Sequence, residues 1–384
     1  MHQFPLKKPD PDFNHLLDVL SGREQPRRVL FCEMLIDEEI KKYLIENHFN
    51  ETNYPPTVTF GGSSGNASDY EATKEASDRY YMQLIDFYYR MGYSVVADYE
   101  FLVNFQSFNT VARIGKDPDS AQFARGERHW AQEGRGIIQS WEDFEKFPWR
   151  EAKALVERYG DHLEFLGQLL PDGMKLAVVG SVLEQVMEWI LGYEGVLYNV
   201  YDDPEFIETI CNEVGKLVYE LYVIAAHMDC VGVIWHGDDL GFNMATLLSP
   251  EHLRRWIFPW FRKYADIAHG QGKPIWYHAC GNKDEIMEDL IEDIGFDALH
   301  SFEDSSNPVT AYKKRYGNRI ALMGGVDIDK LTRLEEKELR SYVRNMLKTC
   351  MPGGRYVLGS GNSVCNYVPV DNYLTMLDEG MRFM

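Results

Sequence analysis

Eight short runs of apolar, β-forming residues recur along this chain, and most of them end in polar or glycine residues. The runs lie at residues 29–31, 94–97, 175–179, 232–235, 274–277, 297–299, 320–323 and 355–358. Stretches with apolar residues at helical spacing lie between them, as in residues 204–227. Eight strands that alternate with helices are the number that closes a parallel (β/α)8 barrel. We therefore expect a (β/α)8 TIM barrel of the α/β class, with a doubly wound open sheet as the structural alternative.

The predicted barrel accounts for residues 1–384 as one domain with an N-terminal extension. A barrel of this kind routinely reaches such a length, so 384 residues do not require a second domain. Two segments interrupt the pattern of strands and helices. Residues 54–69 combine two prolines with a glycine- and serine-rich run, and residues 105–139 form the second segment. We expect both to be loop insertions at the barrel mouth.

The formal net charge of −21 restricts the partners of the protein. A strongly acidic surface repels the phosphates of nucleic acids and the surface of an anionic membrane. No stretch approaches the ~20 apolar residues that span a bilayer. Six cysteines are too few for a disulfide framework in a chain of this length, which favours free thiols or metal ligands. We expect a cytoplasmic protein that binds neither nucleic acid nor membrane, and the sequence leaves a homodimer open.

The run Tyr277-His278-Ala279-Cys280 carries the strongest chemical signal. A His and a Cys two residues apart on an extended segment point to the same side, so both can reach one ion. Cys365 lies in the loop that leaves the eighth predicted strand, which returns to the same rim in a closed barrel. These three ligands suit Zn²⁺ and leave a coordination position open for substrate. The alternative is an incidental His-x-Cys pair without a metal.

Three motifs carry a resemblance to a known family: Gly237-Asp-Asp-Leu-Gly241, Leu248-Ser-Pro-Glu251 and His278-Ala-Cys-Gly-Asn282. With them, the chain resembles the corrinoid-dependent methyltransferases of the uroporphyrinogen decarboxylase superfamily, which include methylcobalamin:coenzyme M and O-demethylase methyltransferases. Further similarities lie at residues 16–22, 137–144, 192–194 and 359–361. The resemblance implies a uroporphyrinogen decarboxylase-like barrel that binds zinc through His278, Cys280 and Cys365. It also implies a partner protein that carries the corrinoid (methylcobalamin), since no cobalamin-binding module is visible in the chain.

Other polar residues at predicted strand ends leave several roles open. No motif identifies a fourth zinc ligand, for which Glu33, Glu100 and Asp238 are candidates. The acid–base candidates beside the metal loop are His236, Asp238, Asp239, His300 and Glu303. We select Asp238 and His236 as catalytic pocket residues, and the alternative is that they are hydrogen-bonding struts of the barrel rim.

Glycine and serine residues after the last two predicted strands could bind a cofactor. The Gly324-Gly325 turn, together with Ser360, could let a ligand approach the backbone closely. The alternative is that Gly324 and Gly325 only form a tight βα turn.

Three functions remain open. In the first, a zinc-dependent methyltransferase passes a methyl group from the corrinoid to a thiol acceptor, or takes one from a methylated or methoxylated donor. In the second, the protein decarboxylates a tetrapyrrole as uroporphyrinogen decarboxylases do. Arg27 and Arg28 precede the first predicted strand instead of following it, which weakens this alternative because substrate carboxylates need a cationic cluster. In the third, a non-catalytic barrel binds a tetrapyrrole.

Overall fold

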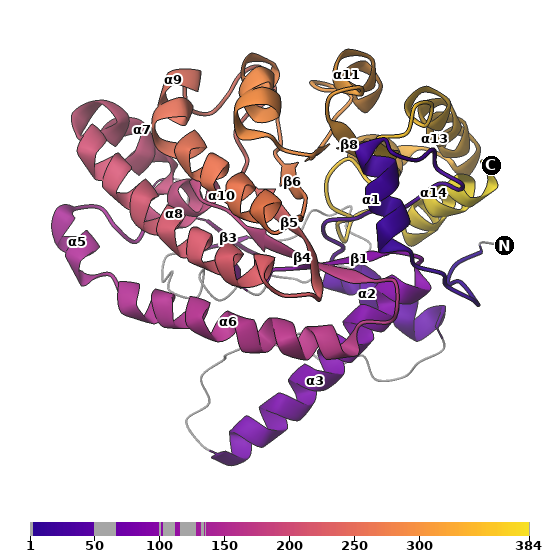
Figure 1. The fold of residues 1–384 in the computed structure, drawn as a ribbon, viewed down its shortest axis with the longest axis horizontal. Coiled ribbons are helices and arrows are strands. Elements are labelled where there is room, and N and C mark those ends of the chain that lie inside the picture. The colour runs from indigo at the N-terminus through magenta and orange to yellow at the C-terminus, as the bar shows by residue number, and fades with distance from the viewer. Residues whose placement is uncertain are drawn as a thin grey trace.

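The computed structural model describes residues 3–49, 67–99, 101–102, 112–115, 128–131, 134 and 136–383. Figure 1 shows strands at the centre of the molecule and helices around them. The statements about structure that follow refer to these residues.

The central sheet is parallel and, in the described part of the chain, has seven strands in the order β1-β4-β5-β6-β7-β8-β9. Its strands are β1 (Val95–Asp98), β4 (Lys175–Gly180), β5 (Val231–Gly237), β6 (Ile275–His278), β7 (Ala298–His300), β8 (Ala321–Met323) and β9 (Tyr356–Val357). Each pair of neighbours is parallel. The helices that alternate with these strands make the fold a TIM-barrel-like α/β structure, as the sequence predicted.

Helices lie before, between and after the strands. They are α1 (Phe13–Ser21), α2 (Glu38–Asn47), α3 (Ala67–Arg90), α5 (Trp141–Lys146), α6 (Trp149–Leu169), α7 (Gly192–Asp202), α8 (Pro204–Ala226), α9 (Pro250–His252), α10 (Phe258–Gly270), α11 (Val309–Tyr316), α12 (Ile328–Arg333), α13 (Glu336–Cys350) and α14 (Val370–Arg382). Short helical segments of other types are η1 (Gln185–Ile190), η2 (Leu253–Ile257), η3 (Asp284–Ile286) and η4 (Asp289–Ile294).

The first predicted strand, residues 29–31, joins the sheet by a single parallel bridge between Phe31 and Leu358. The Leu358 N–H donates to the Leu30 carbonyl at 2.9 Å, and the Cys32 N–H donates to the Leu358 carbonyl at 3.0 Å. This segment is short and its neighbour β9 has only two residues, so the two can form few of the hydrogen bonds of a regular parallel ladder. The structure therefore confirms seven of the eight predicted strands, and within the described residues it gives no ladder between residues 29–31 and β1.

Capping residues explain where two of the predicted helices begin. The Asp203 carboxylate accepts the Phe206 N–H at 3.1 Å, with Pro204 in the first turn of α8. The Ser249 hydroxyl oxygen accepts the His252 N–H at 3.3 Å, with Pro250 in the first turn of α9. In both cases the side chain satisfies an N–H that has no partner within the helix.

The two predicted insertions fall largely outside the described residues. Residues 67–69 of the first belong to α3, so the loop predicted over 54–69 extends too far. In the second, residues Ala112–Gly115 (β2) pair antiparallel with residues Arg128–Ala131 (β3). This small two-stranded sheet was not predicted.

The sheet brings the ends of its central strands together at one rim. Gly237, the last residue of β5, lies opposite His278 of β6, and His278 lies opposite His300 of β7. Trp235 and Trp276 are buried below this rim, with ring centroids 5.3 Å apart. The register thus places the ends of three strands side by side above an aromatic core, with His278 and His300 on adjacent strands. None of the helices in the described ranges is both long and apolar enough to cross a membrane.

Candidate metal centre

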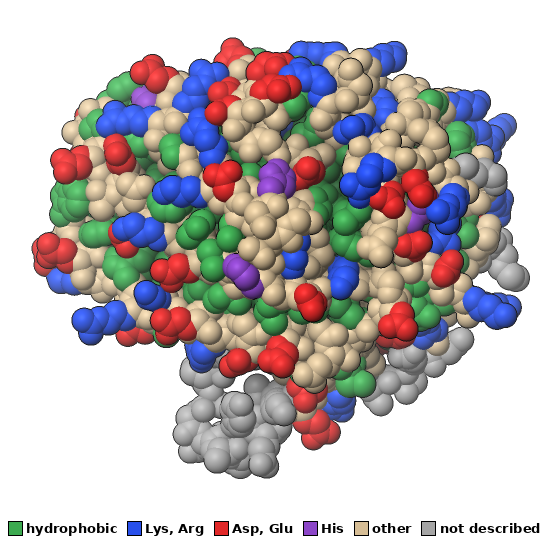
Figure 2. Space-filling model, viewed as in Figure 1, with side chains coloured by type: hydrophobic (Ala, Val, Ile, Leu, Met, Phe, Trp, Pro, Cys, Tyr) green, Lys and Arg blue, Asp and Glu red, His purple; other side chains and the backbone are tan. Residues whose placement is uncertain are grey.

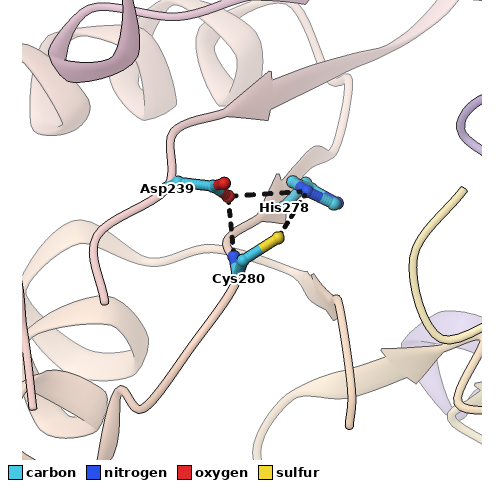
Figure 3. A group of neighbouring side chains, drawn as sticks. All are labelled: Asp239, His278 and Cys280. Atoms are coloured by element: carbon cyan, nitrogen blue, oxygen red, sulfur yellow. Dashed lines mark hydrogen bonds and ion pairs between the residues drawn. The ribbon is translucent and has the colours of Figure 1, made fainter. Parts of the chain in front are cut away.

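Three potential metal-binding atoms converge at the rim of β5 and β6. They come from Asp239, His278 and Cys280, and all lie within 4.8 Å of one another. Figure 3 shows the three side chains pointing toward one another. The Cys280 Sγ lies 3.6 Å from the His278 Nε2, and the nearest Asp239 oxygen lies 3.7 Å from that Nε2.

Backbone contacts hold the loop that carries Cys280. The Cys280 N–H donates to Asp239 Oδ1 at 2.8 Å, and the Asn282 N–H donates to the Phe242 carbonyl at 2.8 Å. Gly281 has φ +74°, and a Cβ on it would lie 2.2 Å from the Gly241 carbonyl carbon. Only glycine fits there without displacing the neighbouring backbone. The loop that carries Cys280 therefore requires glycine at position 281, because the backbone of the loop after β5 lies too close for a side chain.

His300 orients His278. The two Nδ1 atoms are 2.7 Å apart, so one donates a hydrogen bond and the other accepts it. The His300 Nε2 lies 3.4 Å from the Ser360 carbonyl, which can only accept. With a proton on His300 Nε2, its Nδ1 is the acceptor and His278 Nδ1 is the donor. His278 Nε2 then keeps its lone pair and faces Cys280, as a metal ligand must.

Burial determines the protonation states of the two candidate ligands. Burial, and secondarily the charge of Lys283, lowers the pKa of His278 to about 3, so this imidazole is neutral at pH 7. Burial, followed by the charge of Asp239, raises the pKa of the Cys280 thiol well above its ordinary value. Without a cation the thiol therefore stays protonated, and a bound divalent metal would favour the thiolate.

Lys283 is a fully buried cation below this loop. Its Nζ donates to the carbonyls of Ala279 at 2.7 Å and Gly281 at 2.9 Å. Burial lowers the pKa of Lys283 to about 8. The ammonium group thus binds the carbonyls of the two residues that flank Cys280 and fixes the loop conformation.

The donor set fits zinc. An imidazole nitrogen, a thiolate sulfur and a carboxylate oxygen are all ligands that Zn²⁺ accepts. Three protein ligands would leave a coordination position for a substrate atom. The neutral imidazole and its oriented Nε2 meet the further requirement that ligands be unprotonated.

Cys365 lies outside this group of three. Its Sγ contacts the Ser363 carbonyl at 3.6 Å, and within the described residues the metal-binding group includes Asp239 in its place. The same loop nevertheless reaches the site, because the Asn362 side-chain amide donates to Cys280 Sγ at 3.1 Å. The sequence predicted His278 and Cys280 together, and the structure brings them together. It did not select Asp239 as a ligand, although the Gly237-Asp-Asp run at a strand end was the available signal.

His236 and Asp238 are completely buried and bonded to each other. The His236 Nε2 lies 3.0 Å from Asp238 Oδ2, and Asp238 also accepts the N–H groups of Val182 at 3.0 Å and Glu184 at 2.8 Å. The Tyr222 hydroxyl contacts His236 Nδ1 at 2.9 Å. Every one of these contacts holds the rim together. These contacts agree with the alternative, hydrogen-bonding struts of the rim, and the catalytic role of the two residues stays a prediction.

The predicted cofactor-binding residues are occupied by internal contacts. Gly324 and Gly325 have φ +79° and +107°, and a Cβ on Gly324 would lie 2.2 Å from the Ser360 carbonyl oxygen. The Ser360 N–H and hydroxyl donate to Glu33 at 2.7 and 2.6 Å. The turn and Ser360 thus have a packing role in the structure, and their cofactor role stays a prediction.

Of the candidates for a fourth zinc ligand, Glu33 and Asp238 are hydrogen-bonded to other groups. Glu33 is buried with Ser360, and burial raises its pKa to about 8 despite those hydrogen bonds. Asp238 is bonded within the rim as described above. Glu100 lies outside the described residues.

Two carboxylates that the sequence did not single out lie near Asp239. Burial, then the charge of Asp239, raises the pKa of Glu188 to about 7. Burial and the charge of Glu188 raise the pKa of Glu184 well above its ordinary range. The Tyr193 hydroxyl donates to Glu188 at 3.3 Å. The rim thus holds carboxyl groups that retain protons near neutral pH and lie close enough to Asp239 to feel its charge.

Comparison with known proteins places this site in a family. The sequence model of the uroporphyrinogen decarboxylase (URO-D) family matches residues 181–382, which is more than half of the chain and includes Asp239, His278, Cys280 and Cys365. The chain belongs to the URO-D family. The superfamily predicted from the sequence motifs is therefore confirmed. No curated protein sequence matches this URO-D family member.

Solved structures resemble this URO-D protein at low sequence identity. A methyltransferase from Methanosarcina mazei has a TM-score of 0.64 at 14% identity, with 96% of this chain and 97% of that chain covered. A B12-independent methionine synthase from Shewanella sp. W3-18-1, in complex with selenomethionine, has a TM-score of 0.51 at 12% identity, with 85% and 92% covered. These identities support a shared fold.

Proposed function

We propose that this protein is a zinc-dependent methyltransferase that moves a methyl group between a corrinoid carried by a partner protein and a small molecule. The observation that carries the proposal is the convergence of Asp239, His278 and Cys280 at the carboxyl ends of β5 and β6. Active sites of TIM barrels lie at this end of the strands. The folds of a methyltransferase and a methionine synthase agree with such a function.

Zinc would be held by His278, Cys280 and a third ligand. Asp239 is the third donor in the present arrangement. We propose that Cys365 also becomes a ligand, because Asn362 of the same loop already contacts Cys280, and that Asp239 then yields its position to the substrate atom. Bound zinc would activate a thiol acceptor by lowering its pKa, or polarise the leaving atom of a methylated donor.

The residues of the chain would prepare the site for that ion. His300 keeps the His278 Nε2 lone pair available, and Lys283 fixes the loop on either side of Cys280. Glu188, whose pKa is about 7, could hold or release a proton near Asp239 as the substrate binds. Two thiolate ligands would donate strongly to the metal, which favours transfer to a thiol acceptor over demethylation of a methoxylated donor.

Decarboxylation is the second candidate, because the matching family model is that of uroporphyrinogen decarboxylase. Such a substrate carries many carboxylates and needs a cationic cluster. Arg27 instead donates to Glu24 at 3.0 Å, and Arg28 pairs with Asp10 at 3.6 Å, both before the segment that joins β9. They lie at the amino ends of the strands, away from the metal centre. A non-catalytic tetrapyrrole-binding barrel would not require the converging ligands.

Methyl transfer can be tested with zinc-loaded protein and methylcobalamin. The loss of methylcobalamin absorbance in the presence of a thiol, with formation of the methyl thioether, is the expected result. The Cys280→Ala variant should be inactive, and Cys230→Ala should retain activity because Cys230 contacts the Leu163 carbonyl far from the rim. Carbon dioxide release from uroporphyrinogen without any methyl transfer would instead establish the decarboxylase.

A further inference from the structure

A cavity lies at the opposite end of the strands from the metal centre. It has a volume of about 470 Å³ and is bounded by α1 and by the residues that precede β6, β7, β8 and β9. Cavities of this size are typical of small-molecule sites. Figure 2 shows the face on which α1 lies in Figure 1, where basic and acidic side chains are interspersed.

The charged side chains that line this cavity are mainly cationic. Its lining contains four Lys or Arg residues and one carboxylate: Arg23, Lys273, Arg319, Arg355 and Asp297. Asp297 is already occupied, because it accepts from His269 Nε2 and from the Ile275 N–H, both at 2.8 Å. A cationic cavity is unexpected in a chain with a net charge of −21, and it favours an anionic ligand.

The partners of these cations differ. Arg23 pairs with Asp18 at 2.7 Å, and Arg319 pairs with Glu288 and Glu292 at 2.5 and 2.6 Å. Those three carboxylates do not line the cavity. Lys273 donates to the carbonyls of Ala225, at the end of α8, and of Met228, in the turn that follows α8. Within the described residues, the half-buried Arg355 side chain has no hydrogen-bond or ion-pair partner.

Arg355 is also held in an unfavourable backbone conformation. Its φ is +54°, which is the left-handed region, and it is the only non-glycine residue with positive φ in the described part of the chain. The Arg355 N–H donates to the Val19 carbonyl at 2.8 Å, and the Leu322 N–H donates to the Arg355 carbonyl at 3.0 Å. Residues in this region cost free energy and are common at ligand sites. Glycine would satisfy the turn, and the arginine side chain instead lies against Gly22, the residue that ends α1, at the edge of the cavity.

We propose that this cavity binds a small polyanion, carrying phosphate or carboxylate groups, with Arg355 as its principal contact. The planar guanidinium group can form paired hydrogen bonds with either kind of oxyanion. Arg23 and Arg319, which border the same cavity, add positive charge at its edge. The site lies at the amino ends of the strands, so its ligand is distinct from a substrate at the metal centre.

The test is calorimetric titration of the purified protein with pyrophosphate and with citrate at fixed ionic strength. Wild-type protein should bind at least one of them, and which one binds identifies phosphate or carboxylate as the preferred group. Arg355→Gly should bind about tenfold or more weakly, because a pair of charge-assisted hydrogen bonds is lost. Since glycine tolerates positive φ, this variant should fold with an unchanged or higher melting temperature.

Two further variants complete the test. Arg355→Asn also removes the charge and tolerates positive φ, so it should reproduce the loss of binding. Arg333→Gln makes the same charge change on α12, where Arg333 is 77% exposed and pairs with Asp329, and it should leave binding unchanged. The proposal is overturned if neither anion binds wild-type protein, or if the folded Arg355→Gly and Arg355→Asn variants bind as the wild type does.

Discussion

His278 and His300 approach each other through their Nδ1 atoms at 2.7 Å, and this contact fixes which nitrogen of His278 faces Cys280. His300 in turn contacts the Ser360 carbonyl through its Nε2. A backbone carbonyl after β9 therefore determines, through two imidazoles, that His278 Nε2 is free to bind a metal. His300 is not one of the proposed metal ligands, so it is a positioning residue that acts through His278.

Replacement of His300 tests this arrangement. His300→Phe fills a similar volume but cannot accept the His278 proton, so zinc affinity should fall about 10- to 100-fold. His300→Asn offers a polar atom near the position of Nδ1 and should retain more of the affinity. Competition with a chromogenic chelator measures the zinc affinity of both variants. Equal affinity in wild type and His300→Phe would show that His278 needs no such partner.

Neighbouring aspartates provide a matched pair of substitutions. Asp238→Ala leaves two buried N–H groups without an acceptor, which should cost about 1–3 kcal/mol for each group in urea unfolding. Asp239→Asn changes a side chain that is 38% exposed, so it should lower zinc affinity with little effect on the free energy of unfolding. The reverse pattern, a stable Asp238→Ala protein with weak zinc binding, would restore Asp238 as a site residue.

Lys283 allows the metal loop to be loosened without changing a ligand. Lys283→Met keeps the buried aliphatic chain but leaves the Ala279 and Gly281 carbonyls without their donor. We expect lower zinc affinity and faster hydrogen exchange at residues 279–282. Lys263→Met is the control, because Lys263 is exposed on α10 and its ammonium lies 3.8 Å from the centre of the Trp260 ring. Unchanged hydrogen exchange at residues 279–282 in Lys283→Met would contradict the proposal that Lys283 fixes this loop.

Glu33 makes stability depend on pH. Its pKa is raised to about 8 in the folded protein, from about 4.5 ordinarily, so the folded state binds more protons than the unfolded state between these values. The contribution of protonated Glu33 to the free energy of unfolding is fully present below about pH 4.5 and is lost as the pH rises through 8. Glu33→Gln, which keeps the hydrogen bonds to Ser360, should match wild type at pH 5 and exceed it at pH 8.

Urea unfolding at the two pH values measures this difference. The gain at pH 8 should be on the order of 1 kcal/mol or more, since one pKa unit corresponds to about 1.4 kcal/mol. Glu338→Gln, an exposed position on α13, controls for the loss of one negative charge. A constant difference between Glu33→Gln and wild type from pH 5 to 8 would mean that Glu33 is ionised in the folded protein.

Sequence and structure agree most closely where a regular element fixes the geometry. His278 and Cys280 were predicted together because residues two apart at a strand end share a side, and the structure brings them to 3.6 Å. Seven of the eight predicted strands are present, because their apolar residues and polar exits mark them in the sequence. The eighth segment failed to form a ladder because its partner β9 is only two residues long.

The remaining features depend on contacts between distant loops, which no local pattern contains. Asp239 joins the site because the loop after β5 contacts the loop after β6, and Asp238 is withdrawn from it by N–H groups that follow β4. The sequence gives these adjacent aspartates the same local character. The partner of His300 and the position of Cys365 likewise depend on the course of the loop after β9.

Zinc content is the most direct measure of the central claim. Elemental analysis of purified wild-type protein should find about one zinc per chain, and Cys280→Ala should have almost none. Cys365→Ala should also lose zinc if its loop closes onto the site as proposed, whereas Cys230→Ala should keep it. Absence of zinc from wild-type protein after incubation with the metal, or full zinc content in Cys280→Ala, would contradict the account.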